Sequence, residues 1–166
     1  MIITIFTSEA YIKKYTPVGE LVDWAQLSPT VNIVQETYIQ DILGTNFYDY
    51  IQTKYLNQTL NSSETDLVNL IKPAQAYRVA EQALPFINYQ INSKGLMSQS
   101  GDYSQSTDLT GVKYLRGVLY SRADFFAKRL SNFLCENSAL FPEYIADNST
   151  DMSPHSSKYD GGLYLG

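Results

Sequence analysis

Two long segments of this chain place apolar side chains every three or four residues, and no other feature constrains the fold as strongly. The first segment runs from about residue 67 to residue 91, and the second from about residue 109 to residue 137. This spacing lines one face of an α-helix, so each segment predicts a long helix that buries one side. In the second helix we expect the buried face to consist of Val112, Leu115, Leu119, Phe126, Leu130, Phe133 and Leu134.

Pro73 and Pro85 interrupt the first of these segments. Each proline removes a backbone N–H and crowds the preceding turn, so we expect a kinked long helix. We place its end at Lys94 and Gly95, because glycine commonly terminates a helix. The polar segment from Leu96 to Thr107 has no helical period, and a loop of that length is uncommon in a compact domain unless it has a task.

Local signals predict shorter helices before the first long one. Ser28 followed by Pro29 is typical of a helix start, since serine caps the helix and proline needs no N–H partner at the first position. The segment before Ser28 is then expected to be a loop, and Gly44 should end the helix that Ser28 begins. Ser63 together with Asp66 resembles a capping box for the long helix that follows.

These elements together predict an all-α fold, a helical bundle with a long kinked helix and a long C-terminal helix. We expect one helical domain over residues 1–145, in which residues 1–6 form a short extended N-terminal arm. Residues 146–166 are rich in Ser, Asp, Asn, Gly and Pro and cannot bury enough apolar surface alone to offset their ordering entropy. They predict a flexible C-terminal arm that becomes ordered on a partner.

The charge balance disfavours specific binding of nucleic acid. The formal net charge is −5 and the sequence pI is near 4.7, whereas a surface that neutralises phosphates has to be basic. Around the second long helix, however, the basic residues outnumber the acidic ones. We interpret this region as a solvated helix face with ion pairs. Its charged residues are Lys113, Arg116, Arg122, Lys128 and Arg129 against Asp108, Asp124 and Glu136.

Cysteine content and hydropathy predict the compartment. The single cysteine, Cys135, cannot form an internal disulfide, and we expect it to be a small core residue. The first residues lack the basic region of a signal peptide. No apolar stretch approaches the length of a bilayer span, so we expect no membrane contact. The sequence therefore predicts a protein that is made in the cytoplasm and stays there.

Residues that could carry catalysis are few and poorly placed. His155 is the only histidine and lies in the predicted arm, so no Ser–His or Cys–His pair is expected in an ordered site. Gly161 and Gly162 lack the lysine and the following helix of a phosphate-binding loop. Asp41 and Glu81 are scattered acidic residues that we expect at the surface. We therefore predict no enzyme activity, no catalytic residue, no metal site and no cofactor.

Tyrosine is the most unusual part of the composition, with 14 copies. A tyrosine ring buries a large area while its hydroxyl keeps a hydrogen bond. This suits a surface that is exposed to solvent before assembly and buried afterwards. The alternative is that the rings pack on the core with their hydroxyls at the surface. The candidate protein-interface residues lie in the polar loop, at the end of the helical domain and in the C-terminal arm: Tyr103, Tyr144, Tyr159, Leu163, Tyr164 and Leu165.

Several segments of the helical domain are similar to one known group of proteins. The first is VQETYIQDILGTNFY at 34–48, and the others are VKYLR at 112–116, RADFFAKRL at 122–130, NFLCEN at 132–137 and LFPEY at 140–144. Together with Lys94, Gly95 and the polar loop behind them, these segments resemble the head–tail connector, or adaptor, proteins in the neck of tailed phages. The resemblance covers residues 1 to about 145, and its motifs are structural.

The resemblance implies a helical protomer that joins copies of itself into a ring beneath the portal protein. Such a ring would extend the DNA channel, with only non-specific proximity to double-stranded DNA, and would present a docking surface to the next neck or tail protein. The expected location is then the neck of the virion, with host cytoplasm during assembly. A second function class stays open, a soluble helical regulatory or accessory module that binds a transient partner.

Overall fold

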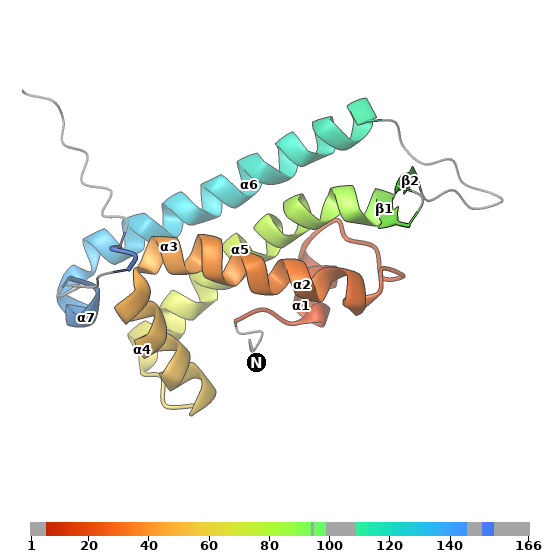
Figure 1. Cartoon of the computed structure of the whole chain (residues 1–166). Helices are drawn as coiled ribbons and strands as arrows, with labels where there is room; N and C mark the ends of the chain where they lie inside the picture. Colours follow the sequence, from red (N-terminus) through yellow and green to blue (C-terminus); the bar gives the residue numbers. More distant parts are fainter. Residues whose placement is uncertain (1–5, 94, 99–108, 146–150, 155–166) are drawn as a thin grey trace, which may run out of the picture.

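The computed structural model describes residues 6–93, 95–98, 109–145 and 151–154 (Figure 1). The elements in these ranges are α1 (Glu9–Tyr15), α2 (Trp24–Val34), the π-helix η1 (Gln35–Ile39), α3 (Gln40–Leu43), α4 (Thr45–Leu56), α5 (Ser62–Asn88), β1 (Tyr89–Asn92), β2 (Gly95–Ser98), α6 (Leu109–Glu136), the 3-10 helix η2 (Ser138–Leu140) and α7 (Pro142–Ile145). The fold is all-α, as predicted, with a small two-stranded hairpin.

The two long helices α5 and α6 lie side by side and set the length of the molecule (Figure 1). α2 packs on α5 as well. In Figure 1, α6 lies along one edge of the molecule, and α4 extends from the end of α3 toward the other edge. Both long apolar periods thus mark real helices. Pro73 and Pro85 lie inside α5 without splitting it.

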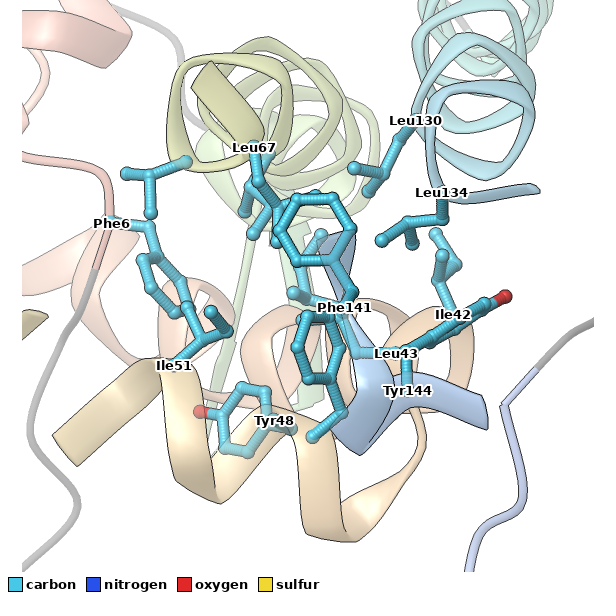
Figure 2. Close-up of a cluster of buried hydrophobic side chains, with 14 of the residues drawn as sticks. Phe6, Ile42, Leu43, Tyr48, Ile51, Leu67, Leu130, Leu134, Phe141 and Tyr144 are labelled. Carbon is cyan, nitrogen blue, oxygen red and sulfur yellow. The ribbon is translucent and has the colours of Figure 1, made fainter. Parts of the chain in front are cut away.

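The hydrophobic core consists of two clusters that are both built on α5. Figure 2 shows the larger one, in which α4, α5, α6 and α7 contribute side chains. Its largest fully buried members are Phe47, Phe141, Ile39, Leu43, Ile51, Leu67, Ile71, Leu130 and Leu134. The smaller cluster joins α1 and α2 to the second half of α5, through Ile12, Leu27, Val31, Val34, Ala76, Val79 and Ala83. α5 therefore serves as the common support of the fold.

The end of α5 differs from the sequence prediction. The helix stops at Asn88 rather than at Lys94 and Gly95, and β1 and β2 form an antiparallel hairpin that pairs Tyr89 with Ser98 and Asn92 with Gly95. The apolar residues near position 90 have helical spacing and predict that the helix continues. In the structure the last hydrogen bond of α5 is donated by the Tyr89 N–H to the Pro85 carbonyl, and the backbone of Tyr89 is already extended. The first residues of the predicted polar loop therefore lie in β2.

Two helix starts also differ from the prediction. α2 begins at Trp24, where the carboxylate of Asp23 accepts a hydrogen bond of 3.0 Å from the Ala25 N–H, and Pro29 lies inside this helix. In α5 the capping box uses Asn61 and Glu64 rather than Ser63 and Asp66. Gly44 does end α3, as predicted, with a φ of 75° that favours glycine.

A short segment after the helical domain contacts the start of α4. The Thr45 N–H donates to the carbonyl of Met152 at 2.9 Å, and the Thr45 hydroxyl donates to the Asp151 carboxylate at 2.8 Å. An acidic side chain at a helix N-terminus is favourable, because free N–H groups and the helix dipole are positive there. Residues 151–154 thus contact the helical domain, although they lie within the segment 146–166 that the sequence predicts to be a flexible arm.

Candidate interaction surface

Within the described part of the chain, other elements cover α6 on one side only. Leu119, Leu130 and Leu134 face α5 and are buried, as the helical period predicts, whereas Leu115 is exposed although we predicted it on the inner face. On the opposite side, four residues at spacings of three and four form the outer face of α6, namely Tyr114, Gly117, Ser121 and Phe125, and all four are exposed. The side chain of Tyr114 is 73% exposed and that of Phe125 is 61% exposed.

An ion pair between a buried carboxylate on α5 and a half-exposed arginine on α6 links the two helices. Glu81 on α5 is 3% exposed, and its Oε1 accepts a hydrogen bond of 2.6 Å from Nε of Arg116 on α6. Its Oε2 lies 3.3 Å from Nη1 of Arg78, one turn away on α5. A buried carboxylate between two guanidinium groups fixes the rotation of α6 about its own axis, because an unpaired charge there would be costly. Glu81 is thus a core residue, and its predicted surface position is wrong.

Aromatic rings extend this contact along the two helices. The guanidinium carbon of Arg78 lies 4.8 Å from the ring centroid of Tyr38 and 5.1 Å from that of Tyr120. The Tyr38 hydroxyl donates a 3.3 Å hydrogen bond to the Ala123 carbonyl on α6, and burial raises the pKa of this phenol to about 12. Tyr77 stacks on Phe126 with the centroids 5.5 Å apart. These contacts hold α6 in place and leave its outer face uncovered.

Three hollows border α6 along its length. One of about 730 Å³ lies near the second half of the helix and includes Phe125, Arg129 and Phe133. Another of about 390 Å³ lies at the start of the helix, lined mainly by apolar side chains and including Lys113. A third, of about 230 Å³, lies between α6 and the segment before α2. The helix therefore stands out from the body as a ridge with grooves along its margins.

The basic residues of α6 divide into two groups. Arg116 pairs with Glu81, Arg122 lies over the Tyr77 ring, and Lys128 pairs with Asp124 at 2.8 Å. Lys113 and Arg129 are exposed and form no ion pair with another described residue. The predicted solvated face with ion pairs is thus only partly right, since two cations at the margins of the ridge have no such partner in the described part of the chain.

Most of the interface residues predicted from sequence fall outside the described residues: Tyr103, Tyr159, Leu163, Tyr164 and Leu165. Tyr144 is described, and its position corrects the prediction. Its ring is 5% exposed and packs edge-on against Phe47 in the larger core cluster, with the centroids 5.5 Å apart, so the ring is already covered within the chain. Cys135, predicted in the core, is exposed near the end of α6.

The outer face of α6 was missed by reasoning from sequence, although a signal for it was present. Tyr114, Gly117, Ser121 and Phe125 follow a helical period of their own, opposite to the period of the leucines. The leucine period accounts for the buried face alone and assigns this second row no role. Because the row begins and ends with an exposed aromatic side chain, it predicts a second partner for the uncovered side.

A metal site needs clustered ligands, and a membrane span needs a long apolar helix. Within the described ranges no three or more His, Cys, Asp or Glu side chains gather where they could hold a metal ion. None of the helices in the same ranges combines the length and the apolarity that crossing a bilayer requires.

Comparison with known proteins gives one match. A model of a protein family of unknown function, DUF6712, matches residues 39–153, which run from the end of η1 through α7 to the segment that contacts Thr45. Neither the curated proteins nor the solved structures contain a match to the chain. The family model includes α5 and α6 and leaves out α1 and α2.

Proposed function

The chain belongs to DUF6712, a family of unknown function. From the exposed surface of α6 and the resemblance of its sequence, we propose that it is a head–tail connector protein of a tailed-phage virion. Copies of the chain form an oligomeric ring in the neck, between the portal protein and the next neck or tail protein. The ring extends the DNA channel, and the protein acts as a structural component rather than as an enzyme.

The observation that carries this proposal is the uncovered aromatic ridge of α6. Tyr114 and Phe125 expose most of their side chains on a helix whose other side is firmly packed. Large exposed aromatic residues at a helical spacing are enriched where proteins bind one another. In a ring, such a ridge on each copy would be covered by a neighbour, and its exposure in the single chain would end on assembly.

Two features of the sequence support the same proposal. The segments from 34 to 48 and from 112 to 144 resemble connector proteins of tailed phages, as described above. The net charge of −5 suits a channel through which DNA slides, because an acidic wall neutralises few phosphates and holds the duplex weakly. Contact with DNA in the channel is accordingly non-specific.

The proposal is tested by mixing the purified chain with the portal ring of the same phage and measuring mass by size-exclusion chromatography with light scattering. A connector should join the portal in a large complex that contains many copies of the 18.8 kDa chain. Negative-stain images of that complex should show added density on one face of the portal ring with the portal's rotational symmetry.

The same measurement distinguishes the alternative function. A soluble regulatory or accessory module should elute as a small species, with the portal peak unchanged in mass. That result would refute the connector proposal. As a specificity control, an unrelated acidic helical protein of similar size should leave the portal peak unchanged under the same conditions.

A further inference from the structure

Charge is distributed unevenly over this chain. Residues 15–53 contain five acidic residues and no lysine or arginine, whereas α6 contains five basic residues and two acidic ones. The first segment spans α2, η1, α3 and most of α4. A molecule with a negative net charge thus carries a strongly acidic part and a locally basic helix.

The acidic part presents an exposed patch, which we call the acidic surface, made of Ile33, Glu36 and Asp49. All three residues are exposed. Glu36 and Asp49 lie close enough to the Tyr48 phenol that their charges, after burial, help to raise its pKa. Neither carboxylate forms an ion pair with another described residue. The patch therefore combines unpaired negative charge with an exposed apolar side chain.

The outer face of α6 has complementary properties. Tyr114 and Phe125 supply aromatic rings at the two ends of the face. Gly117 and Ser121 between them have little or no side chain, so the middle of the face protrudes less than its ends. Lys113 lies at one end of the face and Arg129 at the other, both without an ion pair in the described ranges. A partner surface with carboxylates and an apolar side chain would be complementary to this face in charge and polarity.

Gly117 is a second sign of close approach by a partner. A glycine inside a helix is less stable than alanine, and apart from the backbone of its own helix and its chain neighbours, a Cβ atom at this position would meet no atom within 4 Å. The fold of the single chain thus gives no reason for a glycine here. The missing side chain at Gly117 would let a helix of another molecule pack on the outer face with a short distance between the two backbones.

The two surfaces lie on different elements, the outer face on α6 and the acidic surface on α2, η1 and α4. In Figure 1, α6 forms one edge of the molecule and α4 extends toward the opposite edge. A contact of α6 with α6 in a second copy would place basic residues against basic residues. Contact between the α6 of one copy and the acidic surface of another joins unlike charges, and it leaves the first copy with a free acidic surface and the second with a free outer face of α6.

Building on the connector function proposed above, we propose that the outer face of α6 in one copy binds the acidic surface of the next copy. The contact is heterologous, so repetition of it closes into a ring when the rotation per copy allows. Exposed ion pairs add little affinity each, but their pattern fixes which surfaces meet and in which register. The occupant of the ridge is therefore a second copy of this chain.

Charge exchange tests this pairing. One variant carries Lys113→Glu and Arg129→Glu, a second carries Glu36→Lys and Asp49→Lys, and a third carries all four changes. All four residues are exposed, so thermal unfolding should show that each variant folds. We expect the first and second variants to lose the assembly on the portal, and the third to regain it, because every contact is then reversed and complementary again.

A matched control separates this pairing from a general effect of charge. Lys14→Glu with Lys72→Glu changes the net charge as much as the first variant but lies on neither surface, so assembly should persist. The pairing is refuted if the first two variants assemble normally, if only the α6 variant fails, or if the fourfold variant is folded but does not assemble. Failure of the unaltered chain to join the portal would instead refute the connector function.

Discussion

At the scale of single residues, Glu64 is the clearest example of a charge that stabilises the fold. It is buried at the start of α5, where its Oε1 accepts hydrogen bonds from Lys54 at 2.7 Å and from the Tyr50 hydroxyl at 3.0 Å. Its Oε2 accepts a bond of 2.8 Å from the Asn61 N–H. Burial alone would raise the pKa of this carboxyl, but the bonds from Lys54, Asn61 and Tyr50 outweigh it and the pKa is lowered.

Glu64→Gln should therefore reduce stability at neutral pH by about 1.5–3 kcal/mol, the usual range for hydrogen bonds to a charged group. Because the carboxyl has a lower pKa in the folded chain than the ordinary 4.5, its contribution is complete above that pH. It is lost as the pH falls through the folded value. Urea unfolding at pH 7 and at pH 3 should show that the difference between the unaltered chain and the variant shrinks in acid.

The control for this experiment is Asp66→Asn, which removes an exposed carboxylate from the same helix. It should leave both the stability at pH 7 and its acid dependence close to those of the unaltered chain. A difference between Glu64→Gln and the unaltered chain that stays constant from pH 7 to pH 3 would contradict the assigned role of the charge.

Gly117→Ala should separate folding from assembly. Alanine at an exposed position inside a helix is more favourable than glycine by about 0.5–1 kcal/mol, so the thermal midpoint of the single chain should rise. Assembly on the portal should weaken, because the added methyl group separates α6 from the neighbouring copy. Ser121→Ala, one turn away, adds no bulk and should assemble normally. Stronger assembly of Gly117→Ala would be evidence against a close contact at this position.

At the scale of elements, α6 has one face for its own chain and one for a partner. Leu119→Ala should cost about 2–5 kcal/mol, because the side chain is buried against α5 and a cavity would remain. Tyr114→Ala should change the stability of the single chain by only about 0.5 kcal/mol and should impair assembly. Chemical denaturation of both variants measures the difference. Equal losses of stability would mean that the two faces are wrongly assigned.

The segment that contacts α4 gives a prediction about truncation. A chain that ends after Pro154 keeps the hydrogen bonds between Thr45 and Asp151 and between Thr45 and Met152, so its thermal midpoint should match that of the full chain. A chain that ends after Ala146 loses both bonds and should be less stable by about 1–2 kcal/mol. Identical midpoints for the two truncated chains would show that the contact does not stabilise the fold.

The elements that were predicted correctly are those with strong local signals. The leucine period of α6 and the glycine after α3 determine local structure almost independently of the rest of the chain. The starts of α2 and α5 were placed wrongly because several nearby residues can cap a helix. In the structure Asp23 caps α2 in place of Ser28, and Asn61 caps α5 in place of Ser63. Which of several candidate residues caps a helix depends on packing that sequence spacing does not reveal.

At the scale of the whole molecule, reasoning from sequence found the all-α fold but not the surface that we propose for assembly. The positions of Glu81 and Tyr144 depend on contacts between elements far apart in the chain, with Arg116 and Phe47 respectively. Local composition is a poor guide to such contacts. The outer face of α6 and the acidic surface are each visible in the sequence, but their exposure follows only from the packing of α5.

The central claim is that this chain is one copy in a neck ring and that its α6 ridge is covered there by a neighbour. A reconstruction of the phage neck at side-chain resolution tests this most directly. We expect a ring of this chain next to the portal, with Tyr114 and Phe125 of each copy buried against the acidic surface of the next and with Lys113 and Arg129 near its carboxylates. A neck without this chain, or a ring in which the outer face of α6 stays exposed to solvent, would contradict the account.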